Sequence, residues 1–258
     1  MIRRERVQKE FRSYVSGFDS TDDKIKLKVI HTYKVAENSE RIAGSLGLSS
    51  EDTDLAWLIG MLHDIGRFEQ LRRYHTFSDA DSIDHAKFGA DLLFGEGLIR
   101  KFTDDPGDDD IIETSIRAHN AYVLGEDPDE RRLMFCKIIR DADKIDIFRV
   151  SSEFPKTVVY GTTDEILAKS EVTDEVVRAS LKHETVHRSL KRTPADSIVG
   201  HISLVYGIYY PESIKIIMEQ GYLQKLMDTH NDNPETNRKI RIVSEEVSKY
   251  IDNIQNAL

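Results

Sequence analysis

The chain reads Met61-Leu62-His63-Asp64-Ile65-Gly66 at the end of an apolar helical segment. In this segment Leu55, Ile59 and Leu62 recur at the spacing of one helix face, and Ser49 gives a capping-box-like start. The adjacent histidine and aspartate therefore follow a face that we expect to be buried. Burying an imidazole beside a carboxylate is unfavourable unless a partner neutralises and orders them. We interpret the end of this helix as part of a candidate functional site.

The remainder of the chain also has the pattern of helices. Only 6 Pro and 14 Gly interrupt the 258 residues, and we find no convincing run of alternating strand residues. The sequence therefore predicts an all-α fold, with a polar loop at residues 70–84. The expected helices cover residues 22–46, 49–66, 85–94, 130–150, 173–190, 195–209, 213–228 and 235–254, and a further helix carries Ile112, Ile116 and His119 on one face.

Charge and cysteine content narrow the class of protein. Asp plus Glu number 46 and Lys plus Arg number 36, so the net charge is -10. This balance argues against nucleic-acid and membrane partners, but it leaves room for a small anionic substrate. The single cysteine, Cys136, excludes an intramolecular disulfide and a cysteine-rich zinc site. The charged start lacks the apolar run of a secretory signal, and the most apolar stretch is too polar to span a bilayer, so we expect a soluble cytoplasmic protein.

Other titratable residues share the buried-face pattern of the His63-Asp64 pair. His31, His85, His119 and Asp143 each lie on an apolar face of a separate expected helix. They can converge only if the helices pack as a bundle, in which metal sites are commonly built from facing helices. Imidazole nitrogens and carboxylate oxygens together suit Mn, Fe, Co, Ni or Zn. One such histidine alone is usually a core residue, but the coincidence of five segments favours a metal site.

The order His31, His63-Asp64, Asp143 resembles the HD domain, a superfamily of metal-dependent phosphohydrolases. The flanking residues carry the resemblance further. Leu62-His63-Asp64-Ile65-Gly66-Arg67 is similar to its central motif, and Arg140-Asp141-Ala142-Asp143-Lys144 is similar to its last one. The similarity covers about residues 25–150 and implies an all-α HD-domain helical bundle.

The resemblance also implies a domain organisation. We expect an HD domain with the metal site at residues 22–155, and a C-terminal helical extension at 156–258 that packs on the bundle. Residues 1–21 either stand apart or form one continuous domain with the rest. The extension is also a candidate interface for a homodimer.

The resemblance implies six metal ligands, which are His31, His63, Asp64, His85, His119 and Asp143. In a two-metal site Asp64 bridges the first ion to a second one held by His85 and His119. The alternative is a single metal, with these two histidines lining the pocket and contacting phosphate. Asp141 is the alternative to Asp143, which matches the motif order and has the more apolar helix face. The ions are one or two divalent metals among Mn, Fe, Co, Ni, Zn and Mg.

The activity that the resemblance implies is hydrolysis of a phosphoester, in a nucleotide or related small molecule, by a metal-activated water. Asp64 is expected to hold or bridge the metals. Lys144 and Arg67 are candidate catalytic contacts to the phosphate, with a surface ion pair as the alternative for each. Residues 72–75 are a candidate substrate lid, with an ordinary polar loop as the alternative.

Two other functions remain open. The chain could be an HD-type di-iron oxygenase, or a non-catalytic nucleotide-binding or sensor module. The cyclic-di-GMP-degrading branch carries a Gly-Tyr-Pro signature that is absent here after His119, so we disfavour that substrate. The histidines of the C-terminal part are assigned to surface or core, and they are His183, His187, His201 and His230.

Overall fold

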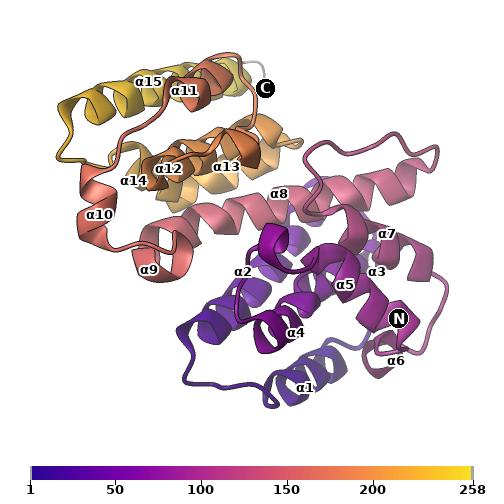
Figure 1. Cartoon of the computed structure of the whole chain (residues 1–258). Helices are drawn as coiled ribbons and strands as arrows, with labels where there is room; N and C mark the ends of the chain where they lie inside the picture. The colour runs from indigo at the N-terminus through magenta and orange to yellow at the C-terminus, as the bar shows by residue number, and fades with distance from the viewer. Residues whose placement is uncertain (1, 257–258) are drawn as a thin grey trace. The chain divides into compact units, whose positions relative to one another are not determined.

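The computed structural model describes residues 2–256, and every regular element within them is a helix (Figure 1). The predicted all-α class is therefore confirmed. The chain divides into two compact units, one ending at Asp143 and the other beginning at Lys144. This division falls inside one long helix, α8 (Glu130–Glu153), whereas the sequence suggested a boundary after residue 155. No change in composition marks this division, and the backbone hydrogen bonds of α8 continue through it.

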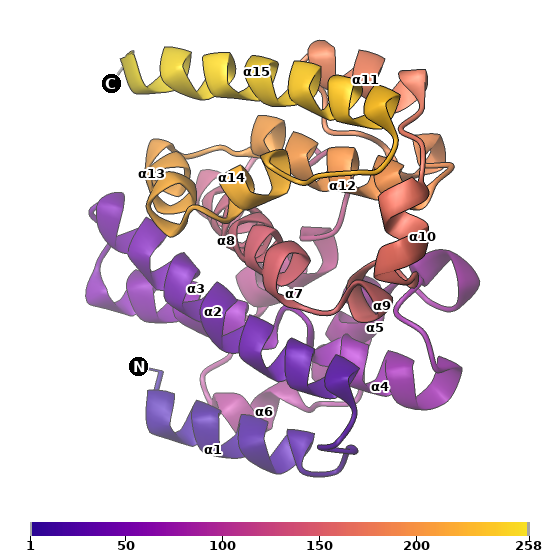
Figure 2. The ribbon, with the colours of Figure 1, turned by 90° about the vertical axis from the view of Figure 1, so that its left-hand side faces the viewer.

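The first unit is built from helices that pack mainly as neighbours in the chain. They are α1 (Arg4–Val15), α2 (Asp23–Ser45), α3 (Ser50–Leu62), α4 (Ile65–Tyr74), η1 (Asp79–Asp81), α5 (His85–Ala90), η2 (Asp91–Gly95), α6 (Ile99–Phe102), α7 (Asp109–Ala118) and the first part of α8. Helix α2 lies along α3, and α5 packs against α4 and α7 (Figure 2). Helix α1 contacts α3 and α6, so the N-terminal residues belong to this unit.

Local chemistry sets both ends of α2 and the start of α3 where the sequence predicted them. The Asp22 carboxylate accepts a hydrogen bond from the Lys24 amide at 2.7 Å, which satisfies an otherwise unpaired group of the first turn. The Ser49 hydroxyl accepts one from the Asp52 amide in the same way, at 3.1 Å. Gly47 follows the end of α2 with a φ of 69°, a left-handed conformation that favours glycine.

The predicted start of the polar loop at residue 70 is wrong. Helix α4 continues to Tyr74 and stops at His75, which has a φ of 58°. Gln70 looks like a loop residue in the sequence but is fully buried, and its amide donates to the Asp79 carboxylate and the Ile83 carbonyl, both at 2.9 Å. The polar side chain of Gln70 therefore holds the following loop against α4 and is not exposed to solvent.

The second unit consists of the end of α8 and shorter helices. They are α9 (Lys156–Val159), α10 (Asp164–Lys169), α11 (Asp174–Leu181), η3 (Arg188–Leu190), α12 (Pro194–Ile202), η4 (Ser203–Gly207), α13 (Pro211–Gln220), α14 (Tyr222–Met227) and α15 (Pro234–Asn256). Helices α11 and α15 lie side by side, and both contact α12 (Figures 1 and 2). The single helix predicted for residues 213–228 is two helices, because Gly221 adopts a φ of 69° between them.

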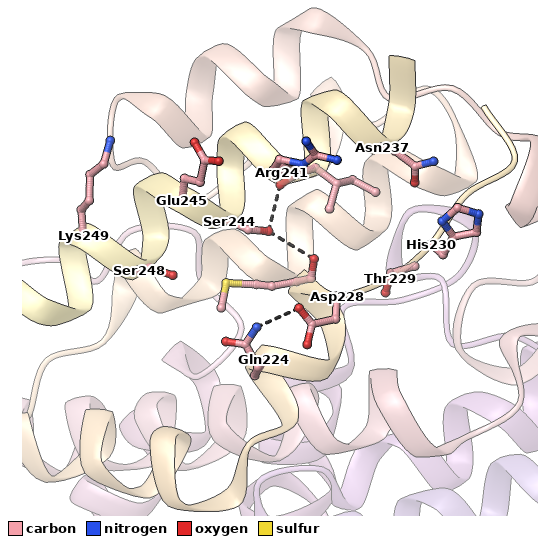
Figure 3. A pocket seen from close by; sticks show the side chains of 12 residues that line it. Gln224, Asp228, Thr229, His230, Asn237, Arg241, Ser244, Glu245, Ser248 and Lys249 are labelled. Atoms are coloured by element: carbon pink, nitrogen blue, oxygen red, sulfur yellow. Dashed lines mark hydrogen bonds between the residues drawn. The ribbon is translucent and has the colours of Figure 1, made fainter. Parts of the chain in front are cut away.

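A groove of about 640 Å³ runs between α14 and α15 in the second unit (Figure 3). Its lining mixes both charges, with Asp228 and Glu245 beside Arg241 and Lys249. Asp228 accepts a hydrogen bond from Gln224 at 2.8 Å. None of the predicted metal ligands lines it.

Within residues 2–256, no helix is long and apolar enough to cross a membrane.

Candidate metal centre

The predicted ligands lie within or at the ends of five helices of the first unit. His31 lies on α2, His63 directly after α3, His85 at the first residue of α5 and His119 directly after α7. Asp143 is the last residue of the first unit, on α8. All the histidines are buried, each with at most 5% of its surface exposed. The structure therefore brings together residues that are up to 112 positions apart in the chain.

Two glycines allow the His63-Asp64 turn to approach its neighbours. A Cβ on Gly60 would lie 2.6 Å from the Cα of Ala36, so α3 rests directly on the backbone of α2. A Cβ on Gly66 would lie 2.4 Å from the carbonyl oxygen of His85, so the start of α4 rests directly on α5. Real Cβ contacts are longer than this, and a side chain at either position would push the ligand-bearing helices apart.

The two carboxylate oxygens of Asp64 face two different pairs of histidines. Its Oδ2 lies 3.5 Å from the Nε2 atoms of both His31 and His63. Its Oδ1 lies 3.4 Å from the Nε2 of His85 and 3.8 Å from that of His119. Within each group the ligand atoms lie within 4.8 Å of one another, which is close enough to hold a metal ion. This geometry is that of a carboxylate able to bridge two cations.

Asp143, rather than Asp141, adjoins the first pair of histidines. Its Oδ1 lies 3.1 Å from the His31 Nε2 and 3.8 Å from the His63 Nε2. Asp141 is buried as well, and neither aspartate belongs to the His/Asp groups of three found among residues 2–256, so the distances from Asp143 to the histidines decide between them. The structure therefore favours Asp143 between the two alternatives.

Hydrogen bonds to Nδ1 fix the orientation of three of the imidazoles. The His63 Nδ1 lies 2.8 Å from the Gly60 carbonyl, and the His119 Nδ1 lies 2.7 Å from the Ile116 carbonyl. The His85 Nδ1 lies 2.7 Å from the Asp79 carboxylate. Because each partner is an acceptor, each neutral ring carries its proton on Nδ1 and turns a lone pair on Nε2 toward the centre. Ligating histidines are commonly held in this way by carbonyls and carboxylates.

The protonation states of the centre suit cation binding. Burial lowers the pKa of His63, and it lowers the pKa of both His85 and His119 to about 4. These rings are therefore neutral near pH 7, as metal ligands must be. Burial alone would raise the pKa of Asp64, but the charges of Lys28 and the surrounding groups hold it well below its ordinary value.

Two residues at this centre were missed in the sequence. The Lys28 ammonium lies 2.5 Å from the Asp64 Oδ2, with its side chain 14% exposed. It precedes His31 by three residues and so shares its helix face, but lysines are almost always solvated and it gave no separate signal. Asp79 orients His85 and accepts a hydrogen bond from Arg67 at 2.8 Å. It lies in the loop after α4, where nothing in the sequence distinguishes it from its acidic neighbours.

Of the two predicted phosphate contacts, Arg67 adjoins the centre. Its terminal nitrogen donates to the Phe77 carbonyl at 2.7 Å and to Asp79, which anchors the guanidinium. Its Nε is buried without a hydrogen-bond acceptor, 3.7 Å from the Asp64 Oδ1. The Lys144 ammonium instead donates to the Gly207 carbonyl at 2.9 Å within the second unit. Its role at phosphate remains a prediction.

Of the residues predicted as a substrate lid, Arg72, Arg73 and Tyr74 lie in α4, and His75 follows its end. Arg72 and Arg73 are in the last turn of α4, and both pair with Glu69 one turn earlier. Their guanidinium groups also lie over aromatic rings, 5.0 Å from the ring centres of Phe18 and Phe88 respectively. Because these contacts hold them on the helix surface, the lid interpretation is corrected.

Among residues 2–256, no group of side chains that could hold a metal ion includes a histidine of the C-terminal part. His183 is partly exposed and stacks on Tyr206, with ring centres 5.1 Å apart. His187 accepts a hydrogen bond from the Ser189 amide, and His230 lines the groove of Figure 3. Their assignment to surface or core is consistent with these positions.

The fold and the centre define an α-helical bundle with a His/Asp cluster suited to divalent metals. Residues 29–147 match the HD domain family, which confirms the predicted resemblance. Ribonuclease Y from Mycoplasma mycoides is 32% identical over 124 residues, which are 48% of this chain and 23% of that protein. The chain thus spans less than a quarter of that relative. No solved structure matches significantly.

Proposed function

We propose that the chain is a metal-dependent phosphohydrolase that cleaves a phosphoester in a nucleotide or a related small phosphorylated molecule. The observation that carries this proposal is the position of Asp64, whose two oxygens each face a separate pair of imidazole Nε2 atoms. The residues that would hold one or two divalent ions are His31, His63, Asp64, His85, His119 and Asp143. A bound ion of this kind lowers the pKa of a coordinated water and draws charge from phosphoryl oxygens.

The positive groups around Asp64 give the substrate phosphate its contacts in this proposal. Arg67 has a buried Nε near Asp64 that lacks an acceptor, while its Nη1 is anchored by hydrogen bonds. This atom is placed to donate to a phosphoryl oxygen at the centre. Lys28 supplies a second positive group, and its partial exposure leaves it accessible from solvent. The net charge of -10 makes such local positive groups necessary for an anionic substrate.

The experiment uses the purified full chain, first with the metal that it retains and then loaded in separate samples with Mn²⁺, Fe²⁺, Co²⁺, Ni²⁺, Zn²⁺ or Mg²⁺. Hydrolysis of bis(4-nitrophenyl) phosphate, 4-nitrophenyl phosphate and a panel of nucleotides is followed by nitrophenolate or phosphate release. We expect turnover in the wild type and background rates in His63→Ala and Asp64→Asn. His183→Ala, outside the centre, is the matched control and should retain the wild-type rate. Absence of turnover with every substrate and metal, or full metal content and activity in both centre variants, would contradict the proposal.

RNA is a second candidate substrate because of the similarity to a protein named ribonuclease Y. The acidic balance of the chain works against extended contacts with a phosphate backbone. Adding a labelled single-stranded RNA to the substrate panel separates the two candidates. Cleavage of RNA faster than of every nucleotide would favour the second.

The two non-hydrolytic alternatives have distinct outcomes in the same samples. An HD-type oxygenase would retain iron and turn over only with oxygen. A sensor module would bind a nucleotide with no turnover under any metal. Titration calorimetry with the nucleotide panel therefore accompanies the rate measurements.

A further inference from the structure

A second cluster of titratable side chains lies in the second unit, and no residue of the metal centre belongs to it. The imidazole of His201 on α12 is at its middle. Its Nδ1 lies 2.7 Å from the Ser151 hydroxyl and 3.3 Å from the Tyr160 hydroxyl. The rings of Tyr160 and His201 also pack on each other, with centres 5.4 Å apart and planes inclined by 32°.

Two lysines bring positive charge to this cluster. The Lys156 ammonium donates to the Ser151 carbonyl at 2.9 Å and lies 5.5 Å from the centre of the Tyr160 ring. The Lys191 side chain lies across Gly200, the residue before His201. A Cβ on Gly200 would be 2.2 Å from the Lys191 Cε and 2.6 Å from its Nζ. Glycine at this position is therefore what allows the lysine to lie against α12.

The positive charge of the cluster has no paired carboxylate. The Lys191 ammonium makes no hydrogen bond or ion pair with any residue that the structure describes. The negative charge of Asp196 raises the pKa of Lys191, which partly offsets the effect of burial. The Asp196 oxygens, however, accept hydrogen bonds from the amides of Thr173 and Arg192, both at 2.8 Å. The charge of Asp164 raises the pKa of Lys156, but its carboxylate forms no ion pair with the Lys156 ammonium.

Burial makes this unpaired charge unfavourable. It lowers the pKa of both Lys156 and Lys191. It also lowers the pKa of His201 to about 3, and the charges of the two lysines contribute to that shift. Bringing positive groups together in a partly buried place without an anion is costly, and an anion that binds there removes the cost.

We propose that Lys191, Lys156 and His201, with the Tyr160 hydroxyl, form a binding site for a phosphate-type oxyanion, either free or carried by a small molecule. The ammonium groups approach from α9 and from the segment before α12, the hydroxyl from the end of α9, and the imidazole from α12. A tetrahedral oxyanion offers acceptors in several directions, whereas a carboxylate offers its lone pairs in one plane. The site is independent of the hydrolytic activity proposed for the first unit.

The experiment measures binding rather than turnover. The full chain is treated with a chelator, dialysed into phosphate-free buffer and titrated with inorganic phosphate by calorimetry and by thermal unfolding. We expect saturable binding and a rise in Tm with phosphate, since a ligand that binds only the folded state stabilises it. Lys191→Met and Gly200→Ala should each weaken binding at least tenfold, because the first removes the ammonium and the second displaces it.

Lys215→Met is the matched control, because Lys215 belongs to the same unit but its side chain is 60% exposed. It should bind phosphate as the wild type does. If Gly200→Ala fails to fold, as circular dichroism would show, Lys191→Met still tests the site. A nucleoside monophosphate that binds more tightly than phosphate would identify a carried phosphoryl group as the ligand. Absence of saturable binding, or Lys191→Met binding like the control, would overturn the proposal.

Discussion

The Nε2 atoms of His85 and His119 lie 3.1 Å apart, and neither ring has a proton there to share. The Nδ1 of His85 faces the Asp79 carboxylate, and the Nδ1 of His119 faces the Ile116 carbonyl, so both protons are on the far side of the rings. Two lone pairs therefore face each other beside the Asp64 Oδ1. Metal–nitrogen bonds of about 2.0–2.1 Å place two ligand nitrogens at about this separation, so a cation resolves the repulsion.

This arrangement predicts that His119→Ala loses one metal ion. We expect two divalent ions per wild-type chain after loading and dialysis, and about one in the variant, because the first group of His31, His63 and Asp64 is unchanged. Inductively coupled plasma mass spectrometry measures the content. His230→Ala, in the groove of the second unit, is the control and should keep both ions. Equal content in His119→Ala and wild type would show that the second pair holds no metal.

Asp79→Asn should weaken binding of the second ion without removing a ligand. Asparagine has only one acceptor oxygen, so it cannot accept from both the His85 Nδ1 and the Arg67 and Gln70 side chains as the two carboxylate oxygens do, and the ring loses its fixed orientation. Loss of such a supporting group typically lowers metal affinity about 10–100-fold. Competition with a fluorescent chelator measures the change. Asp81→Asn is the matched control because Asp81 is exposed on the same loop, and an equal loss in both variants would refute the positioning role.

Lys28→Met should destabilise the protein only when metal is removed. The ammonium lies 2.5 Å from the Asp64 Oδ2, and its loss removes the nearest counter-charge of a buried carboxylate. Breaking such a pair costs about 3 kcal/mol of unfolding free energy, and a bound cation supplies the missing positive charge. Urea unfolding with chelator and with Mn²⁺ tests both conditions. Lys26→Met, with its side chain 51% exposed, should unfold like the wild type in each. A variant that is equally destabilised with and without metal would show that Lys28 acts elsewhere.

Sequence periodicity sufficed for the helices that bear the ligands, because their buried faces repeat over several turns. His31, for example, shares its face with Leu27 and Val35, and all three are buried in α2. Periodicity could not reveal α6, which has only four residues, or the division of the chain inside α8. Such features depend on tertiary packing rather than on a local pattern.

The candidate ligands were predictable because burial of imidazoles and carboxylates is unusual, whereas the residues that support them are ordinary in sequence. Asp79 contacts His85 from six positions away, and Gln70 reaches the same carboxylate from α4. Lys28 pairs with Asp64 across 36 positions. Contacts of this kind follow from how the loop after α4 folds back, and no spacing in the sequence encodes them.

Gly66→Ala and Gly44→Ala should shift stability in opposite directions. At Gly66 a Cβ would meet the His85 carbonyl at 2.4 Å, so α4 and α5 must separate, at a cost of about 1–3 kcal/mol. At Gly44, in the last turn of α2, a Cβ meets nothing within 4 Å, and alanine should add up to about 1 kcal/mol through its helix propensity. Chemical unfolding of both variants tests this. Similar stability in the two variants would mean that the close approach of α4 and α5 is not required.

Because of His201, the free energy of unfolding should decrease as the pH is lowered below neutrality. Its pKa is about 3 in the folded chain, first because of burial and then because of the Lys191 and Lys156 charges, against 6.5 for an ordinary histidine. Between these values the unfolded chain binds a proton that the folded chain does not. The stabilising contribution is therefore complete above pH 6.5 and is lost as the pH falls toward 3.

The predicted slope for this one histidine is at most about 1.4 kcal/mol of unfolding free energy per pH unit. Urea unfolding of the wild type and His201→Gln between pH 7 and about pH 5, in phosphate-free buffer, isolates its share, because the other titrating groups are common to both proteins. The wild type should lose stability more steeply than the variant as the pH falls. Parallel profiles would show that His201 titrates normally in the folded chain. They would also remove the electrostatic basis for an unpaired positive cluster around it.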